Sequence, residues 1–276
     1  MMKKIFNNLQ RPFKIPGKII PKLRNLKSKI EFIKNKKKYK KEIYENRQNQ
    51  TFKALNLDRE LGLIKLNEIR KKYKFLNDQG MSSEHEVLFS SLSLNLKNEI
   101  KEILEIGTFD GSNAFLLSEL FKNSNIETID LDSNKSDFKD FYNRKDKMNK
   151  FLDMRNKNLA RSNRVKFTAM NSINLINHKK NYDLIWIDGA HGYPIACMDI
   201  LNSLKLVNKN GIILCDDIFI NKINSDRMYR SMASFETLNS LKEEKLINFD
   251  LIFKRLNVDN NCVEKNRKFI GIISLT

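Results

Sequence analysis

Residues 103–112 read Ile-Leu-Glu-Ile-Gly-Thr-Phe-Asp-Gly-Ser, a short apolar run that leads into a loop with two glycines. A run of this length is typical of a buried strand, and glycine lets the backbone turn sharply and lets a ligand approach closely. Gly107 and Gly111 do not have the GxGxxG spacing that holds a pyrophosphate at a helix N-terminus. A plain strand-to-helix turn would use the same residues, so the loop alone does not identify a ligand.

The pattern of residues 103–112 recurs along the chain. Four further apolar runs alternate with stretches of helical periodicity, at residues 126–131, 165–167, 182–187 and 211–215. Strands that alternate with helices predict a mostly parallel sheet with helices on both faces. Two last apolar runs, residues 247–256 and 269–275, predict a terminal hairpin. Helical periodicity over residues 51–79 and 83–98 predicts helices ahead of the sheet.

Composition limits the class of protein. Of the 276 residues, 41% are hydrophobic, which is enough for a buried core. No apolar run approaches the roughly 20 residues that a membrane-spanning helix needs. The three cysteines lie far apart, without the paired spacing of a zinc site or a disulfide framework. We therefore expect a cytoplasmic protein, because such cysteine usage fits a reducing compartment.

The net charge of +18 is concentrated near the N-terminus. Residues 1–50 carry 16 Lys or Arg and 3 Glu, a balance of +13, so the rest of the chain carries only +5. Leu23, Leu26, Ile30 and Ile33 recur among these lysines at helical spacing, which is typical of a basic amphipathic helix on an anionic membrane. A solvated helix or a frayed tail would explain the arm as well. Nucleic-acid binding is less favoured, because no recognisable binding module follows.

An acid follows the second predicted strand. In open α/β sheets ligands bind outside the carboxyl ends of the strands, so the residues after each apolar run should line one cleft. Asp130 ends the second run, and an acid about twenty residues after a glycine loop is placed to accept both ribose hydroxyls. Aspartate also ends strands for structural reasons, but Asp130 and the glycine loop together favour a nucleoside site.

Three more carboxylates follow the fourth and fifth predicted strands: Asp188, Asp216 and Asp217. Carboxylates gathered in one cleft raise one another's pKa unless positive charge lies among them. A divalent cation is the simplest source of that charge, and all-oxygen ligands favour a hard ion such as Mg²⁺ or Ca²⁺. The alternative is that one or two of these acids only cap the helices that follow.

His191 lies three residues after Asp188, just past a Gly-Ala turn. We favour a general base, because the neighbouring residues are candidate metal ligands and imidazole titrates near neutral pH. A fourth metal ligand and a structural histidine are the other interpretations. His85 and His178 have no comparable neighbours, and we expect them at surface or capping positions.

Over about residues 80–276 the sequence resembles the class I S-adenosylmethionine-dependent methyltransferases. It is most similar to the divalent-metal-dependent O-methyltransferases, in particular the macrolide-sugar and cephalosporin-hydroxylase-like branch. The most specific match is residues 182–193, Tyr-Asp-Leu-Ile-Trp-Ile-Asp-Gly-Ala-His-Gly-Tyr. The glycine loop at residues 105–112, the acid Asp130 and the segment 211–217 match further motifs of that class.

This resemblance implies an α/β fold: a doubly wound, Rossmann-like, mostly parallel sheet with a C-terminal antiparallel hairpin, preceded by N-terminal helices. We divide the chain into a basic arm at residues 1–50, a helical cap region at 51–100 and a class I methyltransferase domain at 101–276. Residues 80–83 resemble the segment that lies over the cofactor in such enzymes.

The resemblance also implies which residues bind. The residues expected to bind S-adenosylmethionine are Met81, Glu105, Gly107, Thr108, Asp110, Gly111, Ser112, Asp130, Asn171, Ser172 and Asp188. Mg²⁺ or another divalent cation would be held by Asp188, Asp216 and Asp217, with His191 as the catalytic residue. Two positions depart from the family: Asn171 lies where Gly-Asp-Ser is common, and some relatives have lysine in place of His191.

The implied activity is metal-assisted transfer of a methyl group to a hydroxyl. We expect the acceptor to be a sugar, a glycan or another small molecule, and residues 1–50 to contact the inner face of the membrane; a homo-oligomer is left open. The alternatives are a non-catalytic S-adenosylmethionine-binding module and a nucleic-acid methyltransferase that uses the basic arm. The chain lacks the Asn-Pro-Pro, Asp-Pro-Pro and Pro-Cys segments of base methylation. The glycine spacing and the hairpin disfavour a nicotinamide oxidoreductase.

Overall fold

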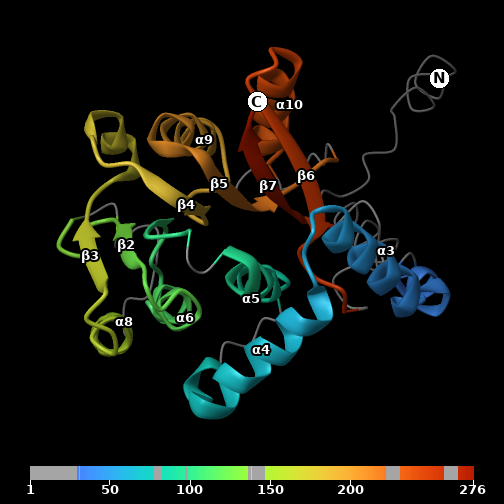
Figure 1. The fold of residues 1–276 in the computed structure, drawn as a ribbon, viewed down its shortest axis with the longest axis horizontal. Helices are drawn as coiled ribbons and strands as arrows, with labels where there is room; N and C mark the ends of the chain where they lie inside the picture. Colours follow the sequence, from blue (N-terminus) through green and yellow to red (C-terminus); the bar gives the residue numbers. More distant parts are fainter. Residues whose placement is uncertain are drawn as a thin grey trace, which may run out of the picture.

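The computed structural model describes residues 30, 32–77, 83–96, 99–135, 138, 147–221, 231–257 and 267–276. They contain a seven-stranded sheet with the order β3-β2-β1-β4-β5-β7-β6 (Figure 1). The strands are β1 (Glu102–Ile106), β2 (Asn125–Asp130), β3 (Val165–Ala169), β4 (Tyr182–Ile187), β5 (Val207–Ile218), β6 (Ile247–Phe253) and β7 (Phe269–Leu275). The first five strands pair in parallel, and β7 runs antiparallel to both β5 and β6. The predicted fold class is confirmed.

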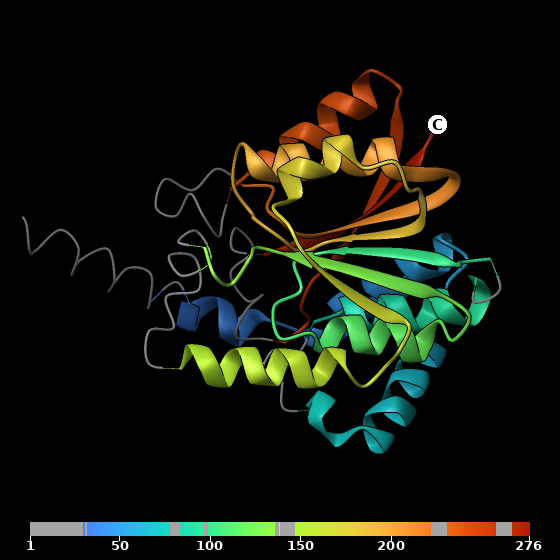
Figure 2. The same ribbon diagram turned by 90° about the vertical axis from the view of Figure 1, so that its left-hand side faces the viewer.

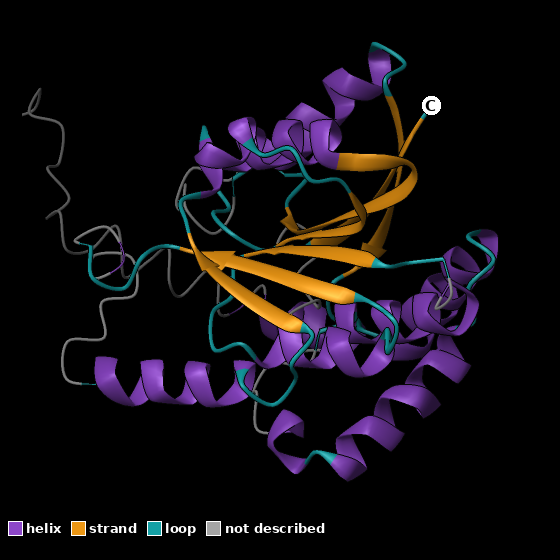
Figure 3. Cartoon of the chain, turned by 60° about the vertical axis from the view of Figure 1, so that its left-hand side comes forward, coloured by secondary structure: helices purple, strands orange, loops and turns teal. Residues whose placement is uncertain are grey.

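Helices cover both faces of this sheet (Figures 2 and 3). They are α3 (Lys41–Ala54), α4 (Arg59–Lys72), α5 (His85–Leu96), α6 (Ser112–Leu120), α8 (Met148–Leu159), α9 (Ile195–Leu206) and α10 (Ala233–Glu243). Two short 3-10 helices, η1 (Lys74–Asn77) and η2 (Ser172–Asn177), lie between these elements. The periodic stretch 51–79 is divided where Asn56 has a φ of +56° and Asp58 caps α4 through the backbone N–H of Leu61.

Neighbouring residues of each strand point into different helical layers. Ile103 and Leu184 pack in a core with residues of α3, α4, α5 and α6. Leu104 and Ile185 pack in the opposite core with residues of α9 and α10. Burial of both faces explains why these strands are nearly continuous apolar runs in the sequence. The N-terminal helices therefore share one core with the sheet.

Most of the basic arm lies outside the described residues, including Leu23 and Leu26, and residues 32–38 are helical. Met81 also lies outside them. Within the described part of the chain, no helix has both the length and the apolar character to cross a membrane. The three-part division of the chain, the membrane contact, the cytoplasmic location and the homo-oligomer stay predictions.

Candidate functional site

The glycine loop is packed tightly against the ends of two other elements. Gly107 has a φ of +104°, and a Cβ atom there would lie 2.2 Å from the carbonyl oxygen of Asp188, at the end of β4. Gly111 precedes α6 with a φ of +74°, and a Cβ atom there would lie 2.9 Å from Cγ of Leu159. Both positions therefore need glycine, for the backbone conformation and for the close packing.

Glu105 and Thr108 are buried at the base of this loop. Glu105 accepts hydrogen bonds from Asn113 Nδ2 at 2.7 Å and from Thr128 Oγ1 at 2.5 Å. The hydroxyl oxygens of Thr108 and Thr128 lie 2.6 Å apart. Burial raises the pKa of the Glu105 carboxyl to about 8 in spite of these hydrogen bonds. The network ties β1 to β2 below the predicted cofactor cleft.

Two acids fix the backbone of the loop. Asp110 Oδ1 accepts hydrogen bonds from Ser112 N at 3.0 Å and from Ser112 Oγ at 2.5 Å, at the start of α6. Asp130 Oδ2 accepts from the backbone N–H of Phe109 at 3.1 Å, and its Oδ1 accepts from Leu131 N at 2.7 Å. Asp130 is half-buried, and its carboxylate orients the loop.

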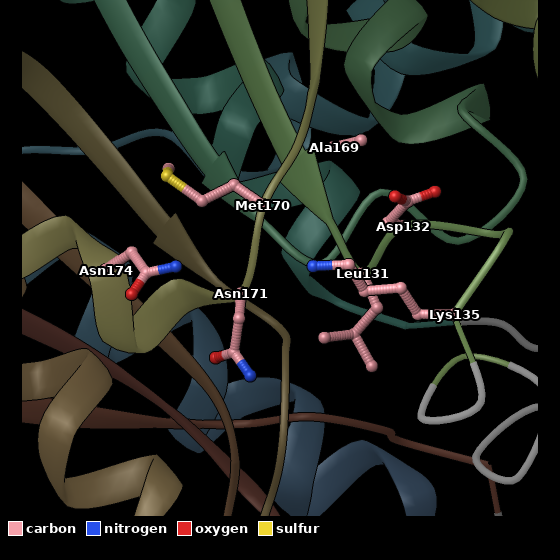
Figure 4. Close-up of a pocket in the computed structure, with 7 residues that line it drawn as sticks. All are labelled: Leu131, Asp132, Lys135, Ala169, Met170, Asn171 and Asn174. Atoms are coloured by element: carbon pink, nitrogen blue, oxygen red, sulfur yellow. The ribbon is translucent and has the colours of Figure 1, made fainter.

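A pocket of about 200 Å³ lies beside the ends of β2 and β3 (Figure 4). The residues that line it are Leu131, Asp132, Lys135, Ala169, Met170, Asn171 and Asn174. Asn171 Oδ1 accepts from Ile173 N at 3.1 Å at the start of η2, and the next residue, Ser172, is half-buried. Asn171 lines this pocket, and Asp130 ends a strand beside it. The two predicted residues therefore lie in the same region.

Two lysines contact the acids that end β5. Lys254 Nζ lies 2.5 Å from Asp216 Oδ2 and 2.5 Å from Asp217 Oδ1. Lys268 Nζ lies 2.7 Å from Asp217 Oδ2. The side chain of Lys254 is only 9% exposed, so this is a buried cluster of charges rather than a surface ion pair.

A distortion of β5 brings both acids to the same lysine. Successive side chains of a regular strand point to opposite faces. The pairing of β5 with β7 shifts register between Cys215 and Ile218, and Asp217 has a φ of +56°. Such a conformation is uncommon for a residue other than glycine and costs free energy that the surrounding contacts must offset. It turns the Asp217 carboxylate toward Lys254, beside that of Asp216.

The cluster gives its members different charge states. Burial would raise the pKa of Asp217, but Lys254, His191 and Lys268 outweigh it and hold that pKa well below its usual range. Burial and the neighbouring Asp216 raise the pKa of Asp188 well above its usual range. Burial lowers the pKa of His191, although Asp217 opposes this shift. At neutral pH His191 is therefore uncharged, with its Nε2 3.5 Å from Asp217 Oδ2.

The predicted metal ligands do not fit a metal ion in this arrangement. Among the residues that the structure describes, no group of three or more His, Cys, Asp or Glu side chains could hold a metal ion. Burial and the charge of Asp216 raise the pKa of Asp188, and Lys254 Nζ contacts both Asp216 and Asp217. The positive charge that three carboxylates need is supplied by ammonium groups, which the sequence analysis missed.

The two histidines outside the motif differ from each other. His85 is half-buried: its ring stacks on Trp186, with centroids 5.2 Å apart, and its Nδ1 lies 2.7 Å from Ser83 Oγ. Burial lowers the pKa of His85 to about 4. His178 does cap η2, and its Nε2 lies 2.9 Å from the hydroxyl of Tyr182.

The sheet order, the glycine loop after β1 and the acid after β2 together define a class I methyltransferase fold. Residues 104–218 match the family model described as a methyltransferase domain. The family match and the fold thus agree on a methyltransferase domain for the part of the chain from β1 to β5. A search of curated protein sequences found no match.

Solved structures share the fold at low sequence identity. The O-methyltransferase TomG from Streptomyces achromogenes is 15% identical, with a TM-score of 0.51 over 84% of this chain and 98% of that chain. An O-methyltransferase from Klebsiella pneumoniae, itself assigned provisionally, is 14% identical, with a TM-score of 0.50 over 86% of this chain and 99% of that one. A Staphylococcus aureus protein described as a caffeoyl-CoA O-methyltransferase, also provisionally, is 15% identical, with a TM-score of 0.50 over 76% and 91%.

Proposed function

We propose that this chain transfers the methyl group of S-adenosylmethionine to a hydroxyl oxygen of a sugar, a glycan or another small metabolite. One observation carries the proposal, and it is the register of three strand ends. Ile106 of β1 pairs with Ile129 of β2 and with Ile187 of β4. The residues that follow these partners, Gly107, Asp130 and Asp188, therefore lie side by side at the carboxyl edge of the sheet.

Each of these groups has a role in the proposed reaction. Asp130 accepts the ribose hydroxyls, and the glycine loop admits the cofactor close to its backbone. The acceptor oxygen attacks the methyl carbon, the carbon–sulfur bond breaks, and its electron pair returns to sulfur. The hydroxyl proton passes to His191, whose lowered pKa keeps it in the neutral form that can accept a proton. No step in this scheme uses a metal ion.

An exposed aromatic ring beside His191 supports an acceptor that contains a ring. Tyr193 lies two residues after His191, and its side chain is 79% exposed. An aromatic side chain with an apolar face and a polar hydroxyl suits a partner of the same mixed character, such as a sugar. We place the acceptor between Tyr193 and His191.

Cofactor binding is the first test. Isothermal titration should show micromolar binding of S-adenosylmethionine to the wild type. The variant Asp130→Asn should bind it at least tenfold more weakly. The variant Asp153→Asn, which changes an exposed acid of α8, should bind it as the wild type does. If S-adenosylmethionine does not bind the wild type, the proposed function is wrong.

Methyl transfer is the second test. S-adenosylmethionine with a radiolabelled methyl group would be incubated with panels of sugars, glycans and hydroxylated metabolites, and with RNA as a separate panel. Label transferred to a hydroxyl acceptor supports the proposal. Tight cofactor binding with no transfer to any panel would instead indicate a binding module.

A further inference from the structure

We propose that the ammonium group of Lys254 takes the position of a divalent metal ion between Asp216 and Asp217, and that this site therefore works with a built-in cation. The proposal concerns the site of the proposed methyl transfer and so rests on that function for its catalytic meaning. The contacts that carry it are the two 2.5 Å distances from Lys254 Nζ to the carboxylates of Asp216 and Asp217.

The topology of the sheet delivers this lysine to the acids. Because β7 runs antiparallel to β5, the start of β7 and the end of β6 lie at the carboxyl edge of β5. Lys268 comes directly before β7, and Lys254 comes directly after β6. The two lysines are paired through the backbone, since Lys254 N donates to Lys268 O at 3.0 Å. Both therefore meet the acids from the same hairpin.

Lys254 is held in place on the side opposite to the acids. Its carbonyl oxygen accepts a hydrogen bond from Glu84 N at 2.8 Å. The preceding residue, Phe253, has its backbone N–H and C=O bonded to Gln48 of α3. Glu84 is itself paired with Arg59, at 2.7 Å. The backbone of Lys254 is thus fixed at several points, which gives its side chain a defined starting position beside the acids.

The charges also oppose a second cation. Asp216 and Asp217 carry two negative charges at most, and Lys254 and Lys268 supply two positive charges. A divalent ion would have to displace the ammonium group of Lys254 from both carboxylates in a buried site, where like charges repel strongly. Removal of that ammonium group would expose a pair of carboxylates, the ligand type that Mg²⁺ and Mn²⁺ bind.

Titration with Mn²⁺, followed by electron paramagnetic resonance, tests this without cofactor or acceptor. We expect no stoichiometric Mn²⁺ binding to the wild-type protein below 1 mM, a bound on the order of the weakest carboxylate sites. The variant Lys254→Met should gain one site at least tenfold tighter than any in the wild type, and the double variant Lys254→Met with Asp216→Asn should lose it. Lys268→Met is the matched control, because Lys254 stays between the acids, and it should gain no site.

Two results would overturn the proposal. One is a Mn²⁺ site in the wild-type protein that fills at micromolar concentration and is removed by Asp216→Asn. This result does not depend on whether a lysine variant folds. The other is a Lys254→Met protein with a cooperative thermal transition that gains no Mn²⁺ site. Neither result depends on S-adenosylmethionine, so failure of the built-in cation and failure of the proposed methyl transfer are separate outcomes.

Discussion

Gln48 pairs with the backbone of Phe253 as a neighbouring strand would. Its Oε1 accepts from Phe253 N at 2.9 Å, and its Nε2 donates to Phe253 O at 3.0 Å. Gln48 is 1% exposed and belongs to α3, more than two hundred residues away in the sequence. The N-terminal helix thus completes the end of β6, next to Lys254, and helps to position the charged cluster.

Replacing Gln48 by leucine should destabilise the protein. Leucine keeps most of the volume but leaves the buried N–H and C=O of Phe253 without partners, at a cost of about 1–3 kcal/mol for each group. The free energy of unfolding, measured by urea denaturation, should fall accordingly. Gln50→Leu, at an exposed position of the same helix, is the control and should change it little. Equal stability of the two variants would contradict a structural role for the Gln48 contact.

Replacing Gly107 by alanine should damage the cofactor site. The added Cβ would lie 2.2 Å from the Asp188 carbonyl oxygen, at a φ of +104°. The loop must move to relieve this clash, so the affinity for S-adenosylmethionine in isothermal titration should fall at least tenfold. Gly189→Ala is a matched comparison, because a Cβ atom at Gly189 would lie 3.2 Å from its nearest neighbouring atom. This variant should lower the melting temperature less than Gly107→Ala does. An unchanged affinity in Gly107→Ala would show that the loop does not contact the cofactor.

The sheet was predictable because it is buried on both faces. Each parallel strand is a short apolar run, and the polar residue after it marks the carboxyl end, as at Asp130 and Asp188. The division of residues 51–79 into two helices was harder to predict. The turn at Asn56 has a positive φ, a conformation that asparagine adopts more readily than most residues but does not require. The 3-10 type of η2 was also hard to predict, because six residues are too few to distinguish a repeat of 3.0 residues per turn from the 3.6 of an α-helix.

The charge partners of Asp216 and Asp217 were not predicted from composition. Lys254 and Lys268 are two of 51 basic residues and belong to no motif. A topological argument would have found them: a terminal hairpin whose second strand runs antiparallel to β5 has the connection between its two strands at the carboxyl edge, where the acids lie. Lys254 and Lys268 reach that edge from the antiparallel strands, whereas the predicted site residues follow parallel strands. The sequence analysis expected a divalent cation among these acids, and the structure places Lys254 and Lys268 in contact with two of them.

The buried Glu105 predicts a pH dependence of stability. Its pKa is about 8 in the folded protein, against 4.5 ordinarily. Between pH 4.5 and pH 8 the folded state therefore binds a proton at Glu105 that the unfolded state has lost. The contribution is complete below pH 4.5 and is lost as pH rises through 8, by at most about 1.4 kcal/mol per pH unit. Urea midpoints should therefore fall with pH more steeply for the wild type than for Glu105→Gln. Parallel curves would show that Glu105 is ionised in the folded protein.

His191 predicts the pH dependence of the reaction. Because burial lowers its pKa, the acid limb of kcat/KM should lie below the 6.5 of an ordinary imidazole, with activity lost as His191 gains a proton. His191→Asn should lower kcat by about 10²–10⁴-fold, the usual contribution of a general base, and should abolish that limb. Its affinity for S-adenosylmethionine should stay close to that of the wild type.

The matched variant for this measurement is His178→Asn. His178 bonds to Tyr182 at the amino end of β4, the opposite end from His191. It should therefore retain the wild-type pH profile in initial-rate assays with a labelled methyl group. A His191→Asn enzyme with the wild-type rate and acid limb would remove His191 from the mechanism. The acceptor proton would then need another base, and Asp217 could not serve efficiently, because its lowered pKa makes it a poor proton acceptor at neutral pH.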